Sequence, residues 1–313
     1  MTGPLAPFLA GGGTLVLDGG LATELERAGF DLDHPLWSAR LLSERPRAIA
    51  AVHRSYLEAG ADCITTASYQ ATTFGFRRAG ATAAEAIGLL WRSVELALAA
   101  RDAFWSGGSG QPVGRLRPLV AASVGPYGAF RADGSEYTGA YGLALDGLLD
   151  FHRERMRLLL EAGPDLLACE TIPSAAEARA LALLLAELGN ARAWVSFSCR
   201  DASRLCDGTP FVDAVSTVAA VPQVVAVGVN CTAPSHVEDL LRAAAAVTDK
   251  PLVAYPNSGE TYDAEVKSWR GTSDPLDWGE RARAWRGAGA RLLGGCCRTG
   301  PDHVRAVRAA LGS

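Results

Sequence analysis

Residues 290–298, Ala-Arg-Leu-Leu-Gly-Gly-Cys-Cys-Arg, join a short apolar run to two glycines and two adjacent cysteines. The run Ala290–Leu293 has the length and composition of a buried β-strand. A helical pattern precedes it at Trp278–Gly287, and another follows it at Pro301–Leu311. This strand between two helices ends a longer alternation, and that alternation decides the fold class.

Short apolar runs and longer helical patterns alternate along the whole chain. The expected strands are Thr14–Asp18, Asp62–Thr66, Pro118–Ser123, Asp165–Cys169, Ala193–Ser198, Val224–Val229, Pro251–Tyr255 and Ala290–Leu293. The expected helices are Arg47–Ala59, Ala84–Ala103, Leu145–Ala162, Ala175–Leu188, Phe211–Ala220, His236–Val247, Trp278–Gly287 and Pro301–Leu311. This order is typical of parallel βαβ units, and eight of them predict a single α/β domain, a (β/α)8 TIM barrel over residues 1–313. A doubly wound open sheet is the alternative that the alternation leaves open.

The composition of the chain limits which binding partners and which cellular compartment are expected. The chain has 313 residues, of which 49% are hydrophobic and 20% charged, enough to build a core. A net charge of −4 and scattered arginines argue against nucleic acid or an anionic membrane as partner. Residues 1–10 lack the basic start of a signal peptide, and no apolar stretch approaches the roughly 18 residues of a membrane span. Seven cysteines without framework spacing indicate metal or catalytic use and predict a cytoplasmic protein.

Polar and sulfur-bearing residues follow most of the expected strands. In a barrel of this kind the carboxyl ends of the strands meet at one face, which carries the active site. The residues that come next in the chain are Asp18-Gly19-Gly20, Thr65–Gln70, Ser123–Pro126, Glu170-Thr171, Asn230-Cys231, Tyr255–Asn257 and Gly294–Cys297. A purely structural barrel does not need polar and sulfur-bearing groups at one face, so this face is predicted to be functional.

Three cysteines, Cys231, Cys296 and Cys297, come from two strand ends. Zinc prefers four ligands, and three protein ligands leave one position for substrate or water. We therefore expect a catalytic zinc site, and sulfur ligands suggest a sulfur substrate. Gly294 and Gly295 are expected to let the backbone turn tightly so that both thiols face the metal. A vicinal disulfide or buried free thiols remain the alternatives.

Taken together, the ordered motifs resemble the homocysteine S-methyltransferase family of zinc-dependent thiol methylases. The matching pieces are Asp18-Gly19-Gly20, Thr65–Gln70, Val124-Gly125-Pro126, Glu170-Thr171, Gly228–Cys231 and Gly294–Cys297, which span almost the whole chain. Residues 64–71, residues 255–260 and Trp269 look most like the branch that uses S-methylmethionine. The length leaves no room for folate or cobalamin modules, and the C-terminal arm of the betaine branch is missing. Methionine synthases and betaine enzymes are therefore not expected.

The resemblance implies roles for individual residues. Cys231, Cys296 and Cys297 would bind Zn²⁺, with Asn230 as a brace behind them, and Asp18 and Glu170 would hold the amino group of homocysteine. Gly19 and Gly20 would offer backbone N–H groups to its carboxylate. The expected lining of the substrate pocket is Thr66, Ser68, Tyr69 and Gln70, and Trp37 would offer an aromatic face to a cationic donor. Simpler alternatives are a turn or helix cap at Asp18, a structural carboxylate at Glu170 and a packed rim residue at Trp37.

These residues predict a metal-dependent methyl transfer. The expected partners are L-homocysteine and a small sulfonium donor, S-methylmethionine or S-adenosylmethionine, acting on a monomer or weak homo-oligomer. The alternatives are another donor such as betaine, or a non-enzymatic zinc or dithiol redox protein. The polar segment Ser258–Leu276 is expected to be a lid or an active-site excursion.

Overall fold

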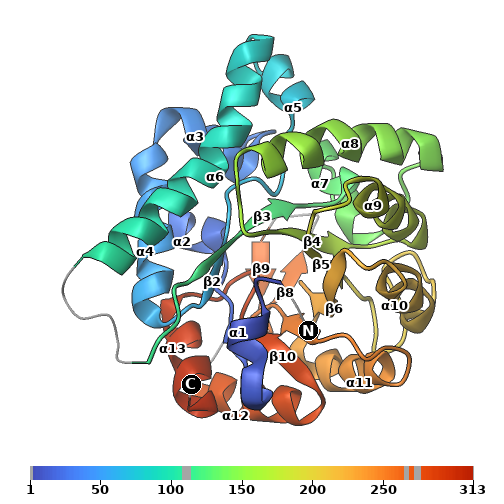
Figure 1. Ribbon diagram of the computed structural model, residues 1–313. Helices are drawn as coiled ribbons and strands as arrows, with labels where there is room; N and C mark the ends of the chain where they lie inside the picture. The colour runs from blue at the N-terminus through green and yellow to red at the C-terminus, as the bar shows by residue number, and fades with distance from the viewer. Residues whose placement is uncertain (1–2, 108–113, 264–267, 271–275, 313) are drawn as a thin grey trace.

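Eight parallel strands form a sheet that closes on itself (Figure 1). The computed structural model describes residues 3–107, 114–263, 268–270 and 276–312. The strand order is β1-β10-β7-β6-β5-β4-β3-β2, and the two outer strands meet through a parallel bridge between Leu17 and Cys63. Asp18 N–H donates to Cys63 O across this junction at 3.1 Å. The predicted (β/α)8 barrel is confirmed, because a doubly wound sheet would leave both edges unpaired.

The barrel elements lie close to their predicted positions. The strands are β1 (Leu15–Val16), β2 (Cys63–Thr65), β3 (Leu119–Val124), β4 (Leu166–Ile172), β5 (Ala193–Phe197), β6 (Val224–Asn230), β7 (Leu252–Tyr255) and β10 (Ala290–Leu293). The helices that follow them are α4 (Pro46–Ala59), α6 (Ala83–Ser106), α8 (Leu145–Glu161), α9 (Ala175–Glu187), α10 (Phe211–Ala219), α11 (Pro234–Ala245), α12 (Leu276–Gly287) and α13 (Pro301–Leu311). Their ends differ from the predicted ones by a few residues at most.

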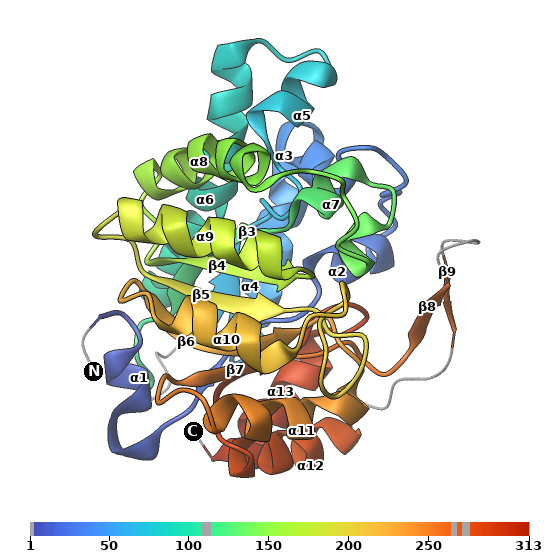
Figure 2. The same ribbon diagram turned by 90° about the vertical axis from the view of Figure 1, so that its right-hand side faces the viewer.

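Smaller elements were not predicted from the sequence. They are α1 (Ala6–Leu9), η1 (Ala10–Gly12), α2 (Leu21–Arg27), η2 (Trp37–Arg40), α3 (Leu41–Glu44), α5 (Thr73–Arg78), α7 (Tyr127–Arg131) and η3 (Ser135–Tyr137), together with the hairpin β8 (Thr261–Asp263) and β9 (Ser268–Arg270). The hairpin occupies part of the predicted excursion Ser258–Leu276, of which residues 264–267 and 271–275 lie outside the described residues. Figure 2 shows α1 at one end of the barrel and α7 and the hairpin at the other.

Two apolar layers surround the sheet. Inside the barrel, side chains such as Leu15, Ala121 and Trp194 pack together, and Leu5 and Leu9 join them from the segment around α1. Alternate strand residues such as Val16 and Val120 instead pack against the helices. The interior is therefore a filled core, and only the carboxyl end of the barrel is left for a site.

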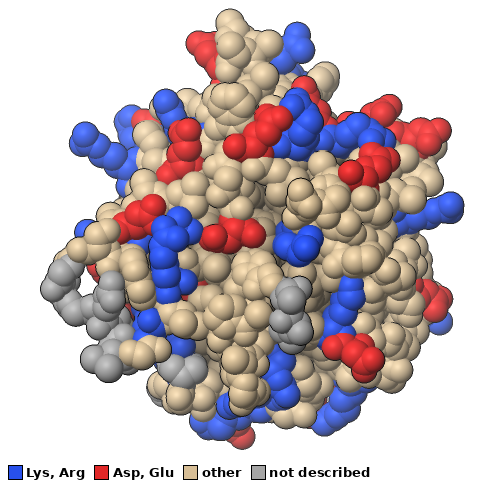
Figure 3. Space-filling model, in the orientation of Figure 1, with Lys and Arg blue, Asp and Glu red and all other residues tan. Residues whose placement is uncertain are grey.

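The surface at the α1 end carries both signs of charge. In Figure 3, Lys and Arg side chains are interspersed with Asp and Glu over this face. That mixture provides no extended basic area on this face for a polyanion. Among the described helices, none has both the length and the apolar character that crossing a bilayer requires.

Candidate metal centre and active site

The three predicted cysteines converge at the carboxyl end of the barrel. The sulfur atoms of Cys231, Cys296 and Cys297 all lie within 4.8 Å of one another, and those of Cys231 and Cys297 are 3.7 Å apart. None of the three forms a disulfide. No fourth protein ligand joins the three thiols among the described residues, and such a set is typical of a catalytic zinc site with one open position. The arrangement fits the metal that the sequence predicts.

The Gly-Gly-Cys-Cys segment is fixed between two neighbouring strand ends. Gly295 N–H donates to Asp18 O at 3.0 Å, and Cys296 N–H donates to Pro256 O at 2.8 Å. Neither Gly294 nor Gly295 has a positive φ, so the expected tight turn is not the reason for these glycines. A Cβ at Gly294 would lie 2.6 Å from Leu17 Cβ, and one at Gly295 would lie 2.6 Å from Thr299 Cβ. The close approach of neighbouring side chains requires glycine at both positions.

Asn230 lies next to the sulfur cluster, where the sequence placed it, and contacts Cys296. Its fully buried amide accepts hydrogen bonds from Thr171 N–H at 2.7 Å and Ser196 Oγ at 2.8 Å. Its Nδ2 donates to Thr171 Oγ1 at 2.8 Å and points at Cys296 Sγ, 3.8 Å away. The side chain therefore links β4, β5 and β6 to a metal ligand.

Asp18 and Glu170 place two buried carboxylates beside the thiols. Asp18 accepts from Thr65 N–H at 2.7 Å and from the Thr65 hydroxyl. Glu170 accepts from Ser123 Oγ and, at 3.1 Å, from the Tyr255 hydroxyl. Within the part of the chain that the structure describes, no basic side chain forms an ion pair with either carboxylate. Two desolvated carboxylates without an ion-pair partner are complementary to an ammonium group.

The pKa values of both carboxyl groups reflect their burial without an ion-pair partner. Burial raises the pKa of Asp18 to about 8, and the nearby charge of Glu170 adds to the shift while the Thr65 bonds oppose it. Burial also raises the pKa of Glu170, against the hydrogen bonds from Ser123 and Tyr255 and the charge of Arg155. A bound ammonium would reverse both effects by favouring the charged forms.

The loop after β2 is held rigidly beside these acids. Thr66 Oγ1 lies 2.6 Å from Ser68 Oγ, which donates to Ser123 O at 2.7 Å, and Gln70 Nε2 donates to Ala129 O. These donors are engaged within the protein, whereas Gln70 Oε1 is buried without a partner among the described residues, and Tyr69 is the aromatic group of the stretch. Its ring meets that of Trp37 edge to face at 6.0 Å. The structure thus brings Trp37 and Tyr69 together at the barrel mouth.

Gly19 and Gly20 follow β1 next to the cysteines. A Cβ at Gly20 would lie 2.8 Å from Cys296 O, and one at Gly19 would lie 2.9 Å from Thr299 Oγ1. Gly20 N–H donates to Thr299 O at 3.1 Å, so Gly19 offers the N–H that is left for a ligand.

The sequence predicted no individual role for four residues that support the site. Tyr255 and Ser123 hold Glu170, and Tyr137 places its hydroxyl 3.8 Å from Cys231 Sγ. Buried Arg155 donates to Ser68 O at 2.7 Å and Tyr69 O at 2.5 Å. Tyr255 and Ser123 lie at strand ends, a position that indicates a functional side chain in a barrel. Tyr137 lies on a long loop and Arg155 within a helical pattern, where residue spacing does not indicate such a role.

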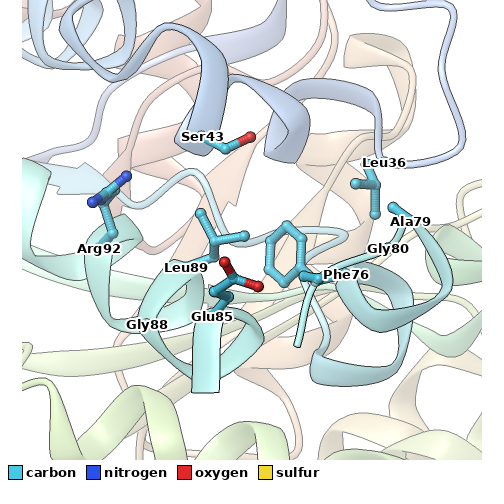
Figure 4. A pocket seen from close by; sticks show the side chains of 10 residues that line it. Leu36, Ser43, Phe76, Ala79, Gly80, Glu85, Gly88, Leu89 and Arg92 are labelled. Atoms are coloured by element: carbon cyan, nitrogen blue, oxygen red, sulfur yellow. The ribbon is translucent and has the colours of Figure 1, made fainter. Parts of the chain in front are cut away.

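The remaining cysteines and a surface hollow lie outside this constellation. Burial raises the pKa of Cys169 to about 12, so this thiol stays protonated and packs as a small apolar group. A hollow of about 550 Å³ lies among α3, α5 and α6, where Figure 4 shows Phe76, Leu89 and Arg92. Its lining includes none of the cysteines or carboxylates of the site.

Comparison with known proteins agrees with this geometry. The sequence model of the homocysteine S-methyltransferase family matches residues 15–311. Homocysteine S-methyltransferase YbgG of Bacillus subtilis (strain 168) is 49% identical over 295 residues, covering 94% of this chain and 93% of that protein. Homocysteine S-methyltransferase of Escherichia coli (strain K12) is 48% identical over 307 residues, covering 98% of each.

A solved relative shares the whole architecture. The crystal structure of the homocysteine methyltransferase MmuM from Escherichia coli, in its metallated form, superposes with a TM-score of 0.87. It is 46% identical in sequence, and the match covers 98% of this chain and 99% of that one. With a barrel, a three-cysteine centre and a family match over nearly its full length, the chain belongs to the homocysteine S-methyltransferase family.

Proposed function

We propose that this protein transfers a methyl group from S-methylmethionine to the thiol of L-homocysteine, forming two molecules of methionine. The observation that carries the proposal is the convergence of three sulfur atoms within 4.8 Å, next to two buried carboxylates. A thiol acceptor with an ammonium group matches both features. The family membership and the metallated relative support the same reading.

Each part of homocysteine has a complementary group in the site. Asp18 and Glu170 receive the ammonium, because both are buried and neither is paired with a cation among the described residues. Gly19 N–H is directed to the carboxylate. Cys231, Cys296 and Cys297 hold zinc, which when bound supplies a deprotonated thiol at neutral pH. Asn230 keeps Cys296 in position throughout.

The donor approaches over the Trp37 and Tyr69 rings. A sulfonium is favoured by aromatic faces, by roughly 0.5–2 kcal/mol depending on desolvation. The C–S bond to the transferred methyl breaks with its electron pair on the donor sulfur, while the thiolate of homocysteine forms the new bond. No general base is needed at that moment, since the thiol proton has already left. Holding both sulfurs in line with the methyl supplies the remaining advantage.

The whole chain acts in this proposal as one homocysteine-binding barrel domain. Free, metal-binding thiols suit a reducing, cytoplasmic compartment. We expect a monomer or weak homo-oligomer. S-adenosylmethionine is expected to be a poorer donor.

The test is methionine formation from homocysteine with S-methylmethionine, betaine and S-adenosylmethionine in parallel, using zinc-loaded wild type. The same assay on Cys297→Ala, with zinc content measured, is expected to show loss of both metal and turnover. Cys206→Ala is the matched control, because this half-buried thiol lies outside the cluster and donates to Ser198 Oγ at 3.5 Å.

Turnover with betaine alone would contradict the donor assignment and leave the acceptor site standing. Full activity of Cys297→Ala would contradict the metal site itself. Bound zinc with no homocysteine binding and no turnover would favour the redox alternative.

A further inference from the structure

A third carboxylate, Glu136, lies on the loop between β3 and α8 and has a buried oxygen without a partner. Its Oε2 is inaccessible to solvent and accepts no hydrogen bond from any described residue. The neighbouring Ser135 Oγ is in the same condition. Asp133, three residues earlier, is instead paired with Arg131 at 2.8 Å. A buried carboxylate oxygen without a partner is costly, so this pair of atoms points to a missing ligand.

The loop brings Glu136 next to the metal centre. The adjacent Tyr137 has its hydroxyl 3.8 Å from Cys231 Sγ. After burial, the charge of Glu136 is the largest cause that raises the pKa of Tyr69, followed by the charge of Cys231. Tyr69 in turn contacts Trp37. The carboxylate therefore lies close to Tyr69 and is next in sequence to Tyr137, whose hydroxyl approaches a metal ligand.

Glu136 is held in this place by the fold. A Cβ at Gly128 would lie 2.7 Å from Glu136 Cα, so α7 packs directly on the backbone of η3. Fully buried Glu177 accepts from Tyr127 N–H at 2.6 Å and Tyr141 O–H at 2.9 Å, on either side of Glu136. Burial raises the pKa of Glu136, and the nearby charge of Asp133 adds to the shift. Such a site is preorganised for a cation that arrives from outside.

We propose that Glu136 binds the positive charge of the methyl donor and so determines specificity for onium donors. This inference rests on the proposed methyl transfer. Asp18 and Glu170 already account for the ammonium of homocysteine, so Glu136 is the carboxylate left for a second cation. Ser135 Oγ supplies an additional polar contact for the donor. Tyr69 and Trp37 complete an aromatic and anionic enclosure for a sulfonium.

The chemistry predicts which kinetic constant Glu136 controls. A thiolate and a sulfonium react to give two neutral thioethers, so the donor charge disappears along the reaction. A carboxylate beside the sulfonium stabilises the bound donor more than the transition state. Its removal should therefore raise the KM for the donor without lowering kcat. A residue that merely supports the fold would lower kcat or affect both substrates.

The experiment compares Glu136→Gln with wild type and with Asp133→Asn on the same loop. Asp133→Asn removes an exposed charge and keeps the oxygen that accepts from Ser135 N–H at 3.0 Å. In Glu136→Gln, the KM for the donor is expected to rise roughly 10- to 100-fold, the range of a lost charged hydrogen bond. The kcat, the KM for homocysteine and the zinc content should match those of wild type within about twofold. Asp133→Asn should match wild type in every constant.

Calorimetry without homocysteine provides a second readout that needs no turnover. S-methylmethionine is titrated into the zinc-loaded proteins, with methionine as the uncharged counterpart. Glu136→Gln should bind the sulfonium at least about tenfold more weakly and methionine as wild type does. Equal sulfonium binding by Glu136→Gln and wild type would overturn the inference. So would an unchanged donor KM.

The two proposals fail in different ways. If wild type uses betaine or S-adenosylmethionine and not S-methylmethionine, the donor assignment is wrong. Glu136→Gln is then measured with the onium donor that works. An unchanged KM for that donor overturns the role of Glu136, while a raised KM supports it.

Discussion

Replacing Asn230 with alanine tests whether the network below the cysteines controls both stability and metal binding. The change removes an amide that is fully buried and makes three hydrogen bonds of 2.7–2.8 Å. It leaves Thr171 N–H without its acceptor inside the protein. An unsatisfied buried group costs about 1–3 kcal/mol, and the lost volume adds to this. We expect the free energy of unfolding of metal-free protein to fall by about 2–4 kcal/mol.

Zinc affinity should fall in addition, because Asn230 Nδ2 faces Cys296 Sγ at 3.8 Å. Loss of a residue that orients a metal ligand typically weakens metal binding by about 10- to 100-fold. The two effects are measured separately, by denaturant unfolding of metal-free protein and by competition for zinc with a chromophoric chelator.

Ser196→Ala is the matched control for this prediction. It removes one donor to Asn230 Oδ1 and the contact with the Tyr255 hydroxyl at 2.6 Å, and it leaves the bonds to Thr171 and the approach to Cys296 intact. We expect it to reduce stability by about 1 kcal/mol and to leave zinc affinity unchanged. Asn230→Ala with wild-type zinc affinity would refute the link between this amide and the metal site. Stability within about 0.5 kcal/mol of wild type would refute the energetic reasoning as well.

Two further predictions concern the acids and the glycines. The pKa of Asp18 is about 8 in the folded protein against 3.8 ordinarily, so the folded form retains a proton that the unfolded chain has released. Stability of metal-free protein should therefore fall as pH rises from about 4 to about 8, and Asp18→Asn should flatten that slope in urea unfolding; parallel slopes would contradict this assignment. Gly295→Ala should weaken zinc binding because its Cβ would lie 2.6 Å from Thr299 Cβ, whereas Gly88→Ala, with open space around it, should be neutral or more stable by up to about 1 kcal/mol. Equal zinc affinity in both alanine variants, from the same chelator competition, would exclude a steric requirement at Gly295.

The barrel and the sulfur cluster were predictable because their signals are local. Ala290–Leu293 and its partners are apolar runs of strand length, and residues directly after such runs must meet at one face. This placed Cys231, Cys296 and Asp18 together correctly. It gave the wrong reason for Gly294 and Gly295, because contacts with Leu17 and Thr299 come from distant parts of the chain.

Glu136 and Tyr137 were missed because they stand on a loop, more than a helical turn beyond the end of β3. Their roles depend on how α7 and η3 pack, which no spacing rule describes. One signal was available: the segment between Val124 and Leu145 is long for a βα connection, and long ordered loops are commonly functional. The short helices around α1 and α5 were missed since four to six residues give too little periodicity.

Backbone strain in the described residues gathers at the face that carries the site. Five described residues other than glycine have a positive φ: Thr171 lies at the carboxyl end of β4, and Trp37, Ala132, Cys231 and Arg298 lie on segments that follow barrel strands. Each such conformation costs on the order of 1–3 kcal/mol and persists only where the surroundings enforce it.

The enforcing contacts come from other strands and helices. Thr171 N–H donates to Asn230 Oδ1 at 2.7 Å, Cys231 N–H to Tyr255 O at 3.3 Å, and Arg298 N–H to Thr23 Oγ1 at 2.9 Å. These bonds exist only when the barrel is closed, so the positions of the metal ligands depend on the complete fold. Closure of the sheet thus offsets the strain that aims the thiols at one point, and an isolated cysteine segment could not reproduce the site.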